Sequence, residues 1–520
     1  MENNEILNFC IKKGLLLDKE VLNLFSDVTD INSVKLIIES IKEKTQQRVI
    51  TKDIFNNNSL LSIFSGLPKE NQQNLEKLKI KLGLNIEISK EFIPNSLENQ
   101  KKEFYDDKSL VKIINPPFSK SKKLSVGDFV SYFRNRFSEM RVFLQEHPEL
   151  TNPISINKLS NNRQTSSLIG IVSSKNLTKN KNLIFEIEDL TGKIKILINK
   201  NKKELYEKAQ EITLDSVIGF KGSGMKEIFF ANDIIFPEIV LPERKKAFVE
   251  EFALFIGDLH IGSKTFMEEE FLKFINYLRG KVPGTEKEVS KIKYLFIVGD
   301  LITGVGVYPG QENEILFSNL ESHFEKAAEL LSKIPKNIQI IFCPGNHDGV
   351  RLMEPQPILD EKYAWPIFNL KNITLTTNPS LINIASRQDF GGFNVLMYHG
   401  FSFFYYADNI SSLMIQKAAH KPELIMKYLL KNRHLAPTHA STQYFPCEKD
   451  SHIIRGIPDI FLAGHTHKSA VSYYNNILCI SVAGWEGMTD YMEKRGAQPD
   501  FCKVPMLNLK TRAIKILDFE

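Results

Sequence analysis

The chain has 520 residues, more than one hydrophobic core usually organises, so roughly two to four domains are expected. Hydrophobic residues make up 42% and charged residues 25% of the sequence, which is typical of a globular protein and excludes a disordered chain. Lys and Arg number 67 against 62 Asp and Glu, a net charge of +5. This balance excludes a global polycation, so any contact with nucleic acid must come from local patches.

The cysteines and the apolar runs indicate the cellular compartment of the protein. The five cysteines are scattered and form no CxxC pair, which argues against a zinc ribbon or a disulfide scaffold and for a reducing compartment. The first residues contain no basic segment followed by an apolar one, and no uncharged apolar run approaches about 18 residues. The sequence therefore predicts a cytoplasmic protein without a membrane span.

The first quarter of the chain predicts a small domain and a tether. Residues 1–66 carry apolar positions at helical spacing, such as Ile37, Ile38 and Ile41, and predict a small helical domain that serves packing. Residues 67–124 are rich in Lys, Asn, Glu and Ser and contain an adjacent proline pair. We expect a flexible linker there, with at most one short helix.

Residues 125–245 predict a helix followed by an OB-fold domain. The helix covers about 126–146 and has one apolar face. Five short β-like runs follow between 166 and 236, with a helical segment after the third, as in an OB-fold barrel. The lysines of this segment suit either nucleic-acid contact or solvated loops: Lys175, Lys179, Lys181 and Lys202.

Residues 246–520 repeat one pattern, in which an apolar, strand-like run ends in a loop that holds Asp, Asn or His. The runs are FALFIGDLH, YLFIVGD, IIFCPGNHD, FNVLMYHG and DIFLAGHTH. Helical stretches such as 267–279 and 319–333 separate them. A domain of mixed α and β structure is therefore predicted, with functional loops at the ends of the strands.

Each of these loops alone is a weak signal, but together they supply a set of metal-binding groups. The set contains Asp258, His260, Asp300, Asn346, His347, Asp348, His399, His465 and His467. Imidazole, carboxylate and amide ligands suit Mn²⁺, Fe or Zn²⁺ better than Mg²⁺ or Ca²⁺. Two cations about 3.5–4 Å apart need an anionic bridge, for which Asp300 is the natural candidate. Such a pair would activate water for in-line attack on a phosphate.

Over about residues 254–470 these motifs resemble the calcineurin-like metallophosphoesterase superfamily, which also contains double-strand-break repair nucleases. The resemblance implies a four-layer αββα sandwich with two divalent metal ions, for which Mn²⁺ is the first candidate. It also implies that Asp258, His260 and His467 bind one metal and that Asp300 bridges the pair.

The same resemblance implies that Asn346, His399 and His465 bind the second metal and that His347 donates the proton to the leaving oxygen. Many members of the superfamily place an Asp three residues after the bridging Asp, where it orients the catalytic His. This chain has Thr303 there, so another group must orient His347 or the rate is modest.

Three further features near these motifs have open interpretations. Asp348 is adjacent to His347 and is one candidate for orienting it. Arg351 is a candidate for contact with phosphate, and a surface salt bridge explains it equally well. The aromatic run from Phe401 to Tyr406 suits base stacking or, for most of its members, core packing. His434 and His439 are expected not to be ligands.

Three stretches hold residues that phosphoesterase chemistry does not require and are similar to the small subunits of archaeal family D DNA polymerases: GVGVYPGQE, PGNHDGVRLMEPQP and KYLLKNRHLAP. The predicted order of helical domain, linker, OB-fold and phosphoesterase also agrees with that family. The resemblance implies a 3′→5′ exonuclease that hydrolyses DNA phosphodiester bonds for proofreading. It would work in a heterodimer or larger assembly with a large polymerising subunit, and with a sliding clamp or other replication proteins as further candidate partners.

Two other classes of function compete with this interpretation. Eukaryotic polymerase B-subunits share the architecture but have degenerate metal motifs and act as scaffolds. A phosphatase or cyclic-nucleotide esterase could use the same metals on small phosphoesters. The intact motifs favour chemistry over a scaffold, and an OB-fold with a tethered domain favours a nucleic-acid substrate.

Overall fold

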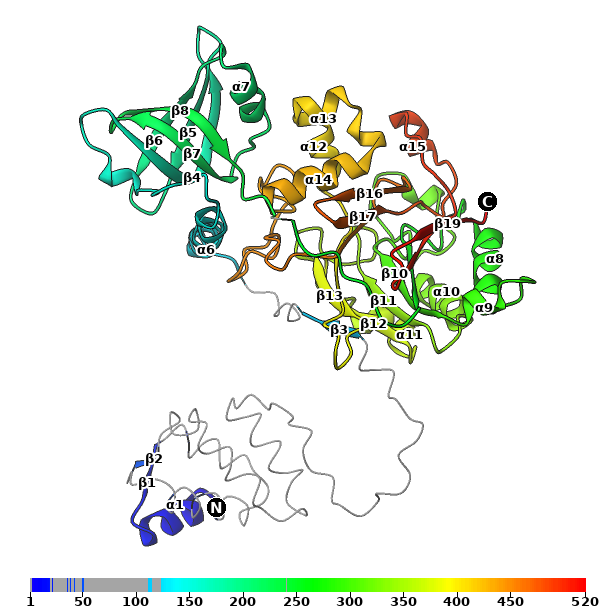
Figure 1. Cartoon of the computed structure of the whole chain (residues 1–520). Coiled ribbons are helices and arrows are strands. Elements are labelled where there is room, and N and C mark those ends of the chain that lie inside the picture. Colours follow the sequence, from blue (N-terminus) through cyan, green and yellow to red (C-terminus); the bar gives the residue numbers. More distant parts are fainter. Residues whose placement is uncertain are drawn as a thin grey trace. The chain divides into compact units, whose positions relative to one another are not determined.

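The computed structural model divides the chain into two compact units, Met1–Phe104 and Tyr105–Glu520, of which each is considered by itself (Figure 1). It describes residues 2–18, 21, 35, 38, 42, 49–50, 111–114, 123–239 and 241–520. In the first unit, helix α1 (Glu2–Lys12) precedes a parallel pair of short strands, β1 (Leu16–Leu17) and β2 (Val49–Ile50). Most of the predicted helical domain and linker lies outside the described residues.

The second unit contains a closed five-stranded barrel, as the sequence predicts, with the order β4-β5-β6-β8-β7. Its strands are β4 (Gln164–Leu177), β5 (Leu183–Glu188), β6 (Lys193–Ile198), β7 (Val217–Gly224) and β8 (Ile228–Ile235). Helix α7 (Lys203–Gln210) follows the third strand. Alternate residues of β5 are buried, and their side chains fill the barrel core. Lys175 is one of the lysines that suit either nucleic-acid contact or solvated loops. It donates to the carbonyl oxygens of Gln210 and Ile212, so its side chain forms hydrogen bonds within the barrel domain.

Helix α6 (Val126–Gln145) lies against the barrel (Figure 1). It begins at Ser125, whose backbone N–H donates to Asp128 in a capping box. Its apolar face, including Phe137 and Leu144, packs on strands β4 and β7. Most of the apolar face predicted for this helix is therefore core, although Val130 is 44% exposed.

The remainder of the second unit is built on two six-stranded sheets. In order, the first contains β12 (Ile373–Leu375), β11 (Gln339–Cys343), β10 (Ile292–Val298), β9 (Phe252–Ile256), β18 (Lys503–Asn508) and β19 (Ile514–Asp518). The second contains β16 (Ala470–Tyr474), β17 (Ile477–Ser481), β15 (Ile460–Ala463), β14 (Phe393–Tyr398), β13 (Ser380–Ile384) and β3 (Val111–Ile113). Because β3 pairs with β13, this part of the segment expected as a linker is a strand of the sheet.

The two sheets pack face to face, and helices cover both outer faces (Figure 1). On β9, Ala253 and Phe255 point into the core between the sheets, whereas Leu254 and Ile256 point toward the helices. The helices on the first sheet are α8 (Glu268–Leu278), α10 (Leu320–Ser332) and α11 (Glu361–Phe368). Those on the second are α12 (Phe403–Asn409), α13 (Ser411–Ile415) and α14 (Pro422–Asn432). Burial on both faces explains why the central strands read as continuous apolar runs.

A buried ion pair joins helix α6 to the part of the chain that contains the two sheets. Arg136 Nε donates to Asp450 Oδ2 at 2.6 Å, with side-chain exposures of 1% and 0%. Tyr132 donates to Asp450 Oδ1 at 2.7 Å, and His434 Nε2 lies 2.9 Å from Oδ2. Burial raises the pKa of Asp450, but the Arg136 charge outweighs it and holds this pKa well below its usual range. Burial lowers the pKa of His434 to about 3, so this imidazole is a neutral donor in the pair.

Every helix among the described residues is too short or too polar to span a bilayer.

We expect Asp450→Asn to lower the free energy of unfolding by about 3–5 kcal/mol, because it leaves the Arg136 guanidinium buried beside a neutral group. Denaturant titration of the full chain measures the change. Glu139→Gln is the matched control: it breaks the Arg455–Glu139 pair, whose side chains are 36% and 30% exposed, and should cost no more than about 1 kcal/mol. Equal losses in the two variants would contradict the role of the buried pair.

Candidate metal centre

Loops at the ends of five strands bring the predicted metal-binding residues together. Strands β9, β10 and β11 are parallel neighbours, as are β14 and β15, so their carboxyl ends lie at one edge of each sheet. The loops after them carry Asp258 and His260, Asp300, Asn346 and His347, His399, and His465 and His467, in that order. The metal-binding residues thus lie just beyond the strand ends, outside the hydrogen-bonded part of each sheet.

The first cluster consists of Asp258, His260 and His467, which could hold a metal ion because their ligand atoms all lie within 4.8 Å of one another. The Nε2 atoms of His260 and His467 are 3.2 Å apart, and Asp258 Oδ1 lies 3.7 Å from His467 Nε2. Burial lowers the pKa of His260 well below its usual range and that of His467 to about 4. Both imidazoles are therefore neutral, the form that binds a cation.

The second cluster consists of Asp300, His399 and His465, whose ligand atoms meet the same 4.8 Å condition. Asp300 Oδ2 is 3.2 Å from His399 Nε2. Asn346 Oδ1 lies 3.0 Å from the same nitrogen, which adds the amide oxygen expected at this position. Burial lowers the pKa of His399, but the Asp300 carboxylate outweighs it and raises this pKa to about 10.

Asp300 faces both clusters. Its Oδ2 lies 3.9 Å from His260 Nε2 in the first and 3.2 Å from His399 Nε2 in the second. Its Oδ1 accepts the backbone N–H of His347 at 2.8 Å. One carboxylate oxygen is thus available between the clusters while the backbone holds the other. Burial raises the pKa of Asp300, but the neighbouring imidazoles outweigh it and keep this pKa well below its usual range.

The donor set fits a pair of divalent cations. In the first cluster two neutral imidazole nitrogens face each other, and at most one of them can donate a hydrogen bond to the other. Burial also raises the pKa of Asp258 well above its usual range, an unfavourable setting for a carboxylate unless positive charge is supplied. Imidazole, carboxylate and amide oxygen together suit Mn²⁺, Fe or Zn²⁺.

Backbone strain is concentrated at this site. Left-handed φ angles, uncommon outside glycine, occur at Asp258 (49°), His260 (49°), Asp300 (48°), His465 (67°) and His467 (51°). Such conformations persist only where the surrounding structure enforces them. Here the backbone N–H of Asp258 donates to Gly299 O at 3.1 Å, and that of His260 donates to Asp300 O at 3.0 Å. The first two loops thus hold each other in place.

Two glycines allow the close approach that the site requires. A Cβ on Gly299 would collide with the His399 ring, and a Cβ on Gly345 would collide with the Asp300 carboxylate. Gly299 before Asp300 and Gly345 before Asn346 are therefore required by packing against the second cluster.

A backbone carbonyl orients His347. Its Nδ1 donates to Thr303 O at 2.8 Å, so the main chain of Thr303 orients the ring. Asp348 has a different role from the one considered above: it accepts the backbone N–H of Ile302 at 3.1 Å and of Gly345 at 2.7 Å. It ties two loops together and leaves the His347 ring to Thr303.

Glu486 belongs to the site, although no motif in the sequence analysis includes it. Its Oε2 lies 4.0 Å from His260 Nδ1, which has no hydrogen-bond partner among the described residues. Burial raises the pKa of Glu486 to about 7. Strand β17 is a parallel neighbour of β15, so the GWEG run after it reaches the same edge of the sheet. The GWEG run after an apolar strand marks Glu486 as a strand-end residue, but the sequence does not record its approach to His260.

Arg351 is engaged by its own loop. Its Nη2 donates to Pro355 O at 2.7 Å, and its guanidinium lies 4.2 Å from the ring centroid of Phe445. Its side chain remains part-buried, and phosphate contact by Arg351 stays a prediction.

Residues 253–469 match the calcineurin-like phosphoesterase family. Together with the stacked sheets and the buried His and Asp clusters, this match defines the class: a phosphoesterase domain with candidate sites for two metals. Over 409 residues the chain is 38% identical to the DNA polymerase II small subunit of Pyrococcus furiosus, an alignment that covers 77% of this chain and 65% of that longer protein. The small subunit of Pyrococcus horikoshii is 35% identical, with 88% and 73% covered, and that of Methanothermobacter thermautotrophicus 33%, with 76% and 80% covered. The chain therefore belongs to the DNA polymerase II small subunits of the archaeal family D polymerases.

We expect Mn²⁺ binding to release protons and to strengthen as the pH rises between about 6 and 9, because a cation must displace the proton of a ligand such as His399. The raised pKa of His399, about 10, keeps that proton in place at neutral pH without metal. Calorimetric titration in buffers of different ionisation enthalpy measures the release. The exposed His420→Ala variant should behave as the wild type, and an affinity independent of pH would contradict the prediction.

Proposed function

We propose that this chain is the small subunit of a replicative archaeal DNA polymerase and a two-metal 3′→5′ exonuclease that hydrolyses DNA phosphodiester bonds for proofreading. The observation that carries the proposal is the meeting of two His and Asp clusters at Asp300. A scaffold subunit would have no need to keep both clusters and the strained loops that form them. The family relationship supports DNA over small phosphoesters as substrate.

In this proposal Asp258, His260 and His467 bind the first metal, and Asp300 bridges to the second. A backbone group orients Asp258: the N–H of His465 donates to Asp258 Oδ1 at 3.0 Å and to Oδ2 at 2.9 Å. The chemistry that two such cations supply is polarisation of the phosphate and a water activated near neutral pH.

Asn346, His399 and His465 complete the second metal site in this proposal. Two contacts position His399. Its backbone N–H donates to the side-chain oxygen Oδ1 of Asn378 at 2.9 Å, and its ring atom Nδ1 lies 3.1 Å from the backbone oxygen of Val298. A neutral His399 donates from Nδ1 to this carbonyl, which leaves Nε2 as the ligand atom. Mn²⁺ is the first candidate, with Fe and Zn²⁺ as alternatives.

His347 is the proposed proton donor. Because Nδ1 donates to Thr303 O, the second ring nitrogen, Nε2, is the one free to carry a proton to the leaving oxygen. The ring lies edge-on to His260, with centroids 4.6 Å apart and an interplanar angle of 89°. It is therefore beside the metal ligands without being required among them.

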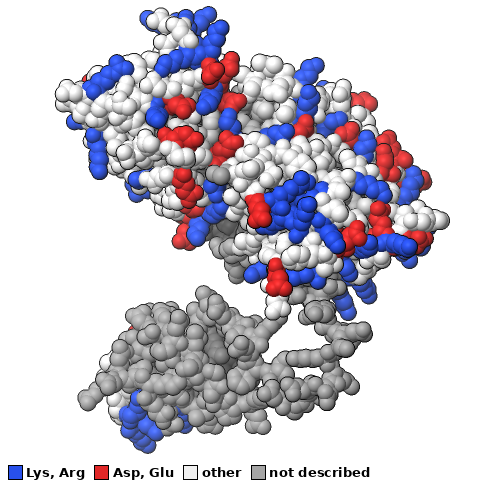
Figure 2. Space-filling model, viewed as in Figure 1, with Lys and Arg blue, Asp and Glu red and all other residues white. Residues whose placement is uncertain are grey.

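A large polymerising subunit is the proposed partner, because the relatives of this chain are named as small subunits of a polymerase. Figure 2 shows both Lys and Arg and Asp and Glu on the described part of the viewed face. Mixed charge of this kind and a net charge of +5 predict weak, salt-sensitive DNA binding by the chain alone. The large subunit would supply most of the affinity. A sliding clamp and other replication proteins remain predicted partners.

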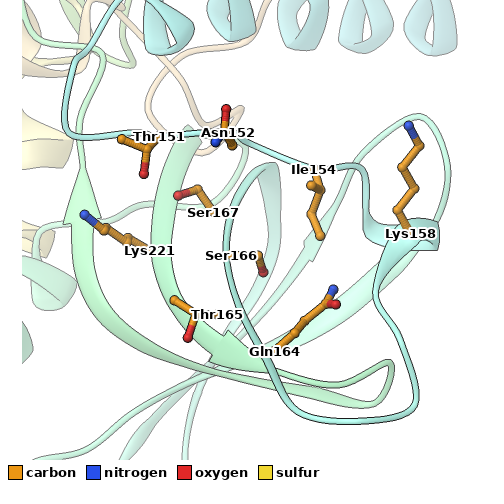
Figure 3. Close-up of a pocket in the computed structure, with 9 residues that line it drawn as sticks. All are labelled: Thr151, Asn152, Ile154, Lys158, Gln164, Thr165, Ser166, Ser167 and Lys221. Atoms are coloured by element: carbon orange, nitrogen blue, oxygen red, sulfur yellow. The ribbon is translucent and has the colours of Figure 1, made fainter.

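The barrel offers one candidate contact for the DNA backbone. A hollow of about 380 Å³ on its surface is lined largely by polar side chains, including Asn152, Lys158, Gln164 and Lys221 (Figure 3). Amine, amide and hydroxyl groups donate hydrogen bonds to phosphate oxygens. Since none of the described residues that line the hollow is aromatic, the hollow suits the backbone of a strand better than its bases.

The proposal is tested with end-labelled single-stranded DNA and matched and mismatched primer–templates, in Mn²⁺, with and without the large subunit. We expect loss of 3′ nucleotides, faster from single-stranded and mismatched ends than from matched ends. A phosphomonoester is assayed in parallel. Turnover of the monoester without degradation of DNA would favour a phosphatase, and bound metal without either activity would favour a scaffold.

We expect Asp300→Asn to lose bound metal and activity together, because it replaces the proposed anionic bridge with a neutral amide. Metal content after dialysis and single-strand degradation are measured on the same sample. Asp408→Asn, at an exposed position of helix α12, serves as the control. An Asp300→Asn protein with wild-type metal content would count against the bridge.

We expect His347→Ala to keep both metals and to lose roughly 10²–10⁴-fold in rate, the usual contribution of a general acid. An ester with a leaving group of low pKa needs no proton and should be slowed far less than DNA. Rates on the two substrates are compared at saturating Mn²⁺. If the activated ester is slowed as much as DNA, His347 is not the proton donor.

A further inference from the structure

The aromatic run after His399 divides into two sets with opposite environments. Phe403 and Tyr406 are fully buried under the second sheet, and the partly buried Tyr405 packs against the same core. Phe401 and Phe404 are 37% and 41% exposed. Core packing, the interpretation favoured for most of this run, therefore explains the first set and leaves two phenyl rings at the surface.

Both exposed rings lie against one proposed metal ligand. The ring centroids of Phe401 and Phe404 are each 5.4 Å from that of His465, with interplanar angles of 43° and 62°. The His465 ring in turn lies 5.0 Å from that of His399. Each phenyl ring thus lies beside an imidazole of the second cluster, so a group that touches these rings lies next to the proposed metal site.

The local fold sets this arrangement. Gly400 has a φ of 113°, a conformation that side-chain-bearing residues rarely adopt, and it turns the chain away from the end of β14 directly after His399. Phe401 follows in the turn, and Phe404 lies in the first turn of α12. Because Phe403 is anchored in the core between them, the two rings are held outward on a fixed backbone.

We propose that Phe401 and Phe404 form a stacking platform that receives the unpaired base of the nucleotide being removed. Apolar aromatic faces without a charged group suit a nucleobase, and they accept any base because every base has a π-face. Inside a duplex the faces of a base are covered by its neighbours, so the platform accepts bases at single-stranded or frayed ends. The inference rests on the proposed nuclease function and adds to it the two residues that would receive the unpaired base, Phe401 and Phe404.

The competing role for the two rings is to shield His465 from water. A shield acts on the metal site whatever the substrate, whereas a platform acts only when the substrate has a base. The two roles therefore differ in how substitution of the rings combines with removal of the base.

The experiment combines Phe401→Leu, Phe404→Leu and the double variant with two oligonucleotides. One is a single strand of thymidines, and the other has tetrahydrofuran abasic residues at the two positions of the degraded end. The full chain is used with Mn²⁺, alone and with the large subunit. Each ring should contribute about 5- to 150-fold to kcat/KM on the thymidine end, and the same variants should leave kcat/KM on the abasic end unchanged within about 2-fold.

Two further variants keep the test independent of folding. Phe401→Tyr and Phe404→Tyr retain an aromatic face and should retain the preference for a base. Phe248→Leu removes another exposed ring, 65% exposed and paired with Phe390 at 5.9 Å, and should leave both substrates unaffected.

Equal losses on the thymidine and abasic ends would show that the rings shield His465 and would overturn the platform. No loss on either end would also overturn the platform. In both cases cleavage by the wild type would leave the proposed nuclease function standing. A wild-type chain with bound metal that cleaves neither oligonucleotide, alone or with the large subunit, would overturn the proposed function and this inference with it.

Discussion

The apolar contact between the two sheets is the constraint on which the site depends. Side chains such as Phe255, Phe296, Met397 and Leu462 are fully buried in this core, and the rings of Phe255 and Phe296 stack with centroids 5.3 Å apart. The first cluster and the second both draw ligands from loops of the two sheets. A slip of one sheet past the other would therefore separate the ligand atoms within each cluster, whatever the local conformation of the loops.

That rigid scaffold also explains how the chain tolerates an unfavourable centre. Buried carboxylates, neutral imidazoles at close range and left-handed backbone at five site residues each cost free energy. These site residues lie at the ends of strands. The interiors of the same strands are continuous apolar runs, and their packing on both faces stabilises the fold. A bound pair of cations would offset much of the electrostatic part, because it favours the ionised carboxylates and the neutral imidazoles that the site needs.

The barrel is linked to the same centre by a chain of buried polar contacts. Asp450, which neutralises Arg136 of helix α6, accepts the backbone N–H of His452 at 3.0 Å. His452 Nε2 lies 2.8 Å from Glu354 Oε2, which also accepts from Tyr398 at 3.2 Å. Tyr398 directly precedes His399. One network of buried polar contacts thus runs from helix α6 to the end of β14.

Much of this arrangement follows from local sequence. Apolar runs that end in GD, GNHD, YHG or GHTH predict strands with polar loops, and parallel strands place those loops at one edge, so the mixed α and β fold, the barrel and the gathering of Asp258 through His467 were all predictable. Four features were not: the Thr303 carbonyl that orients His347, the approach of Glu486 to His260, the outward rings of Phe401 and Phe404, and the use of Val111–Ile113 as a strand. The physical reason is the same in each case. Every residue has the same carbonyl group, and which residue approaches a ring or a sheet edge depends on how the two sheets pack, a relationship between distant segments that no local pattern records.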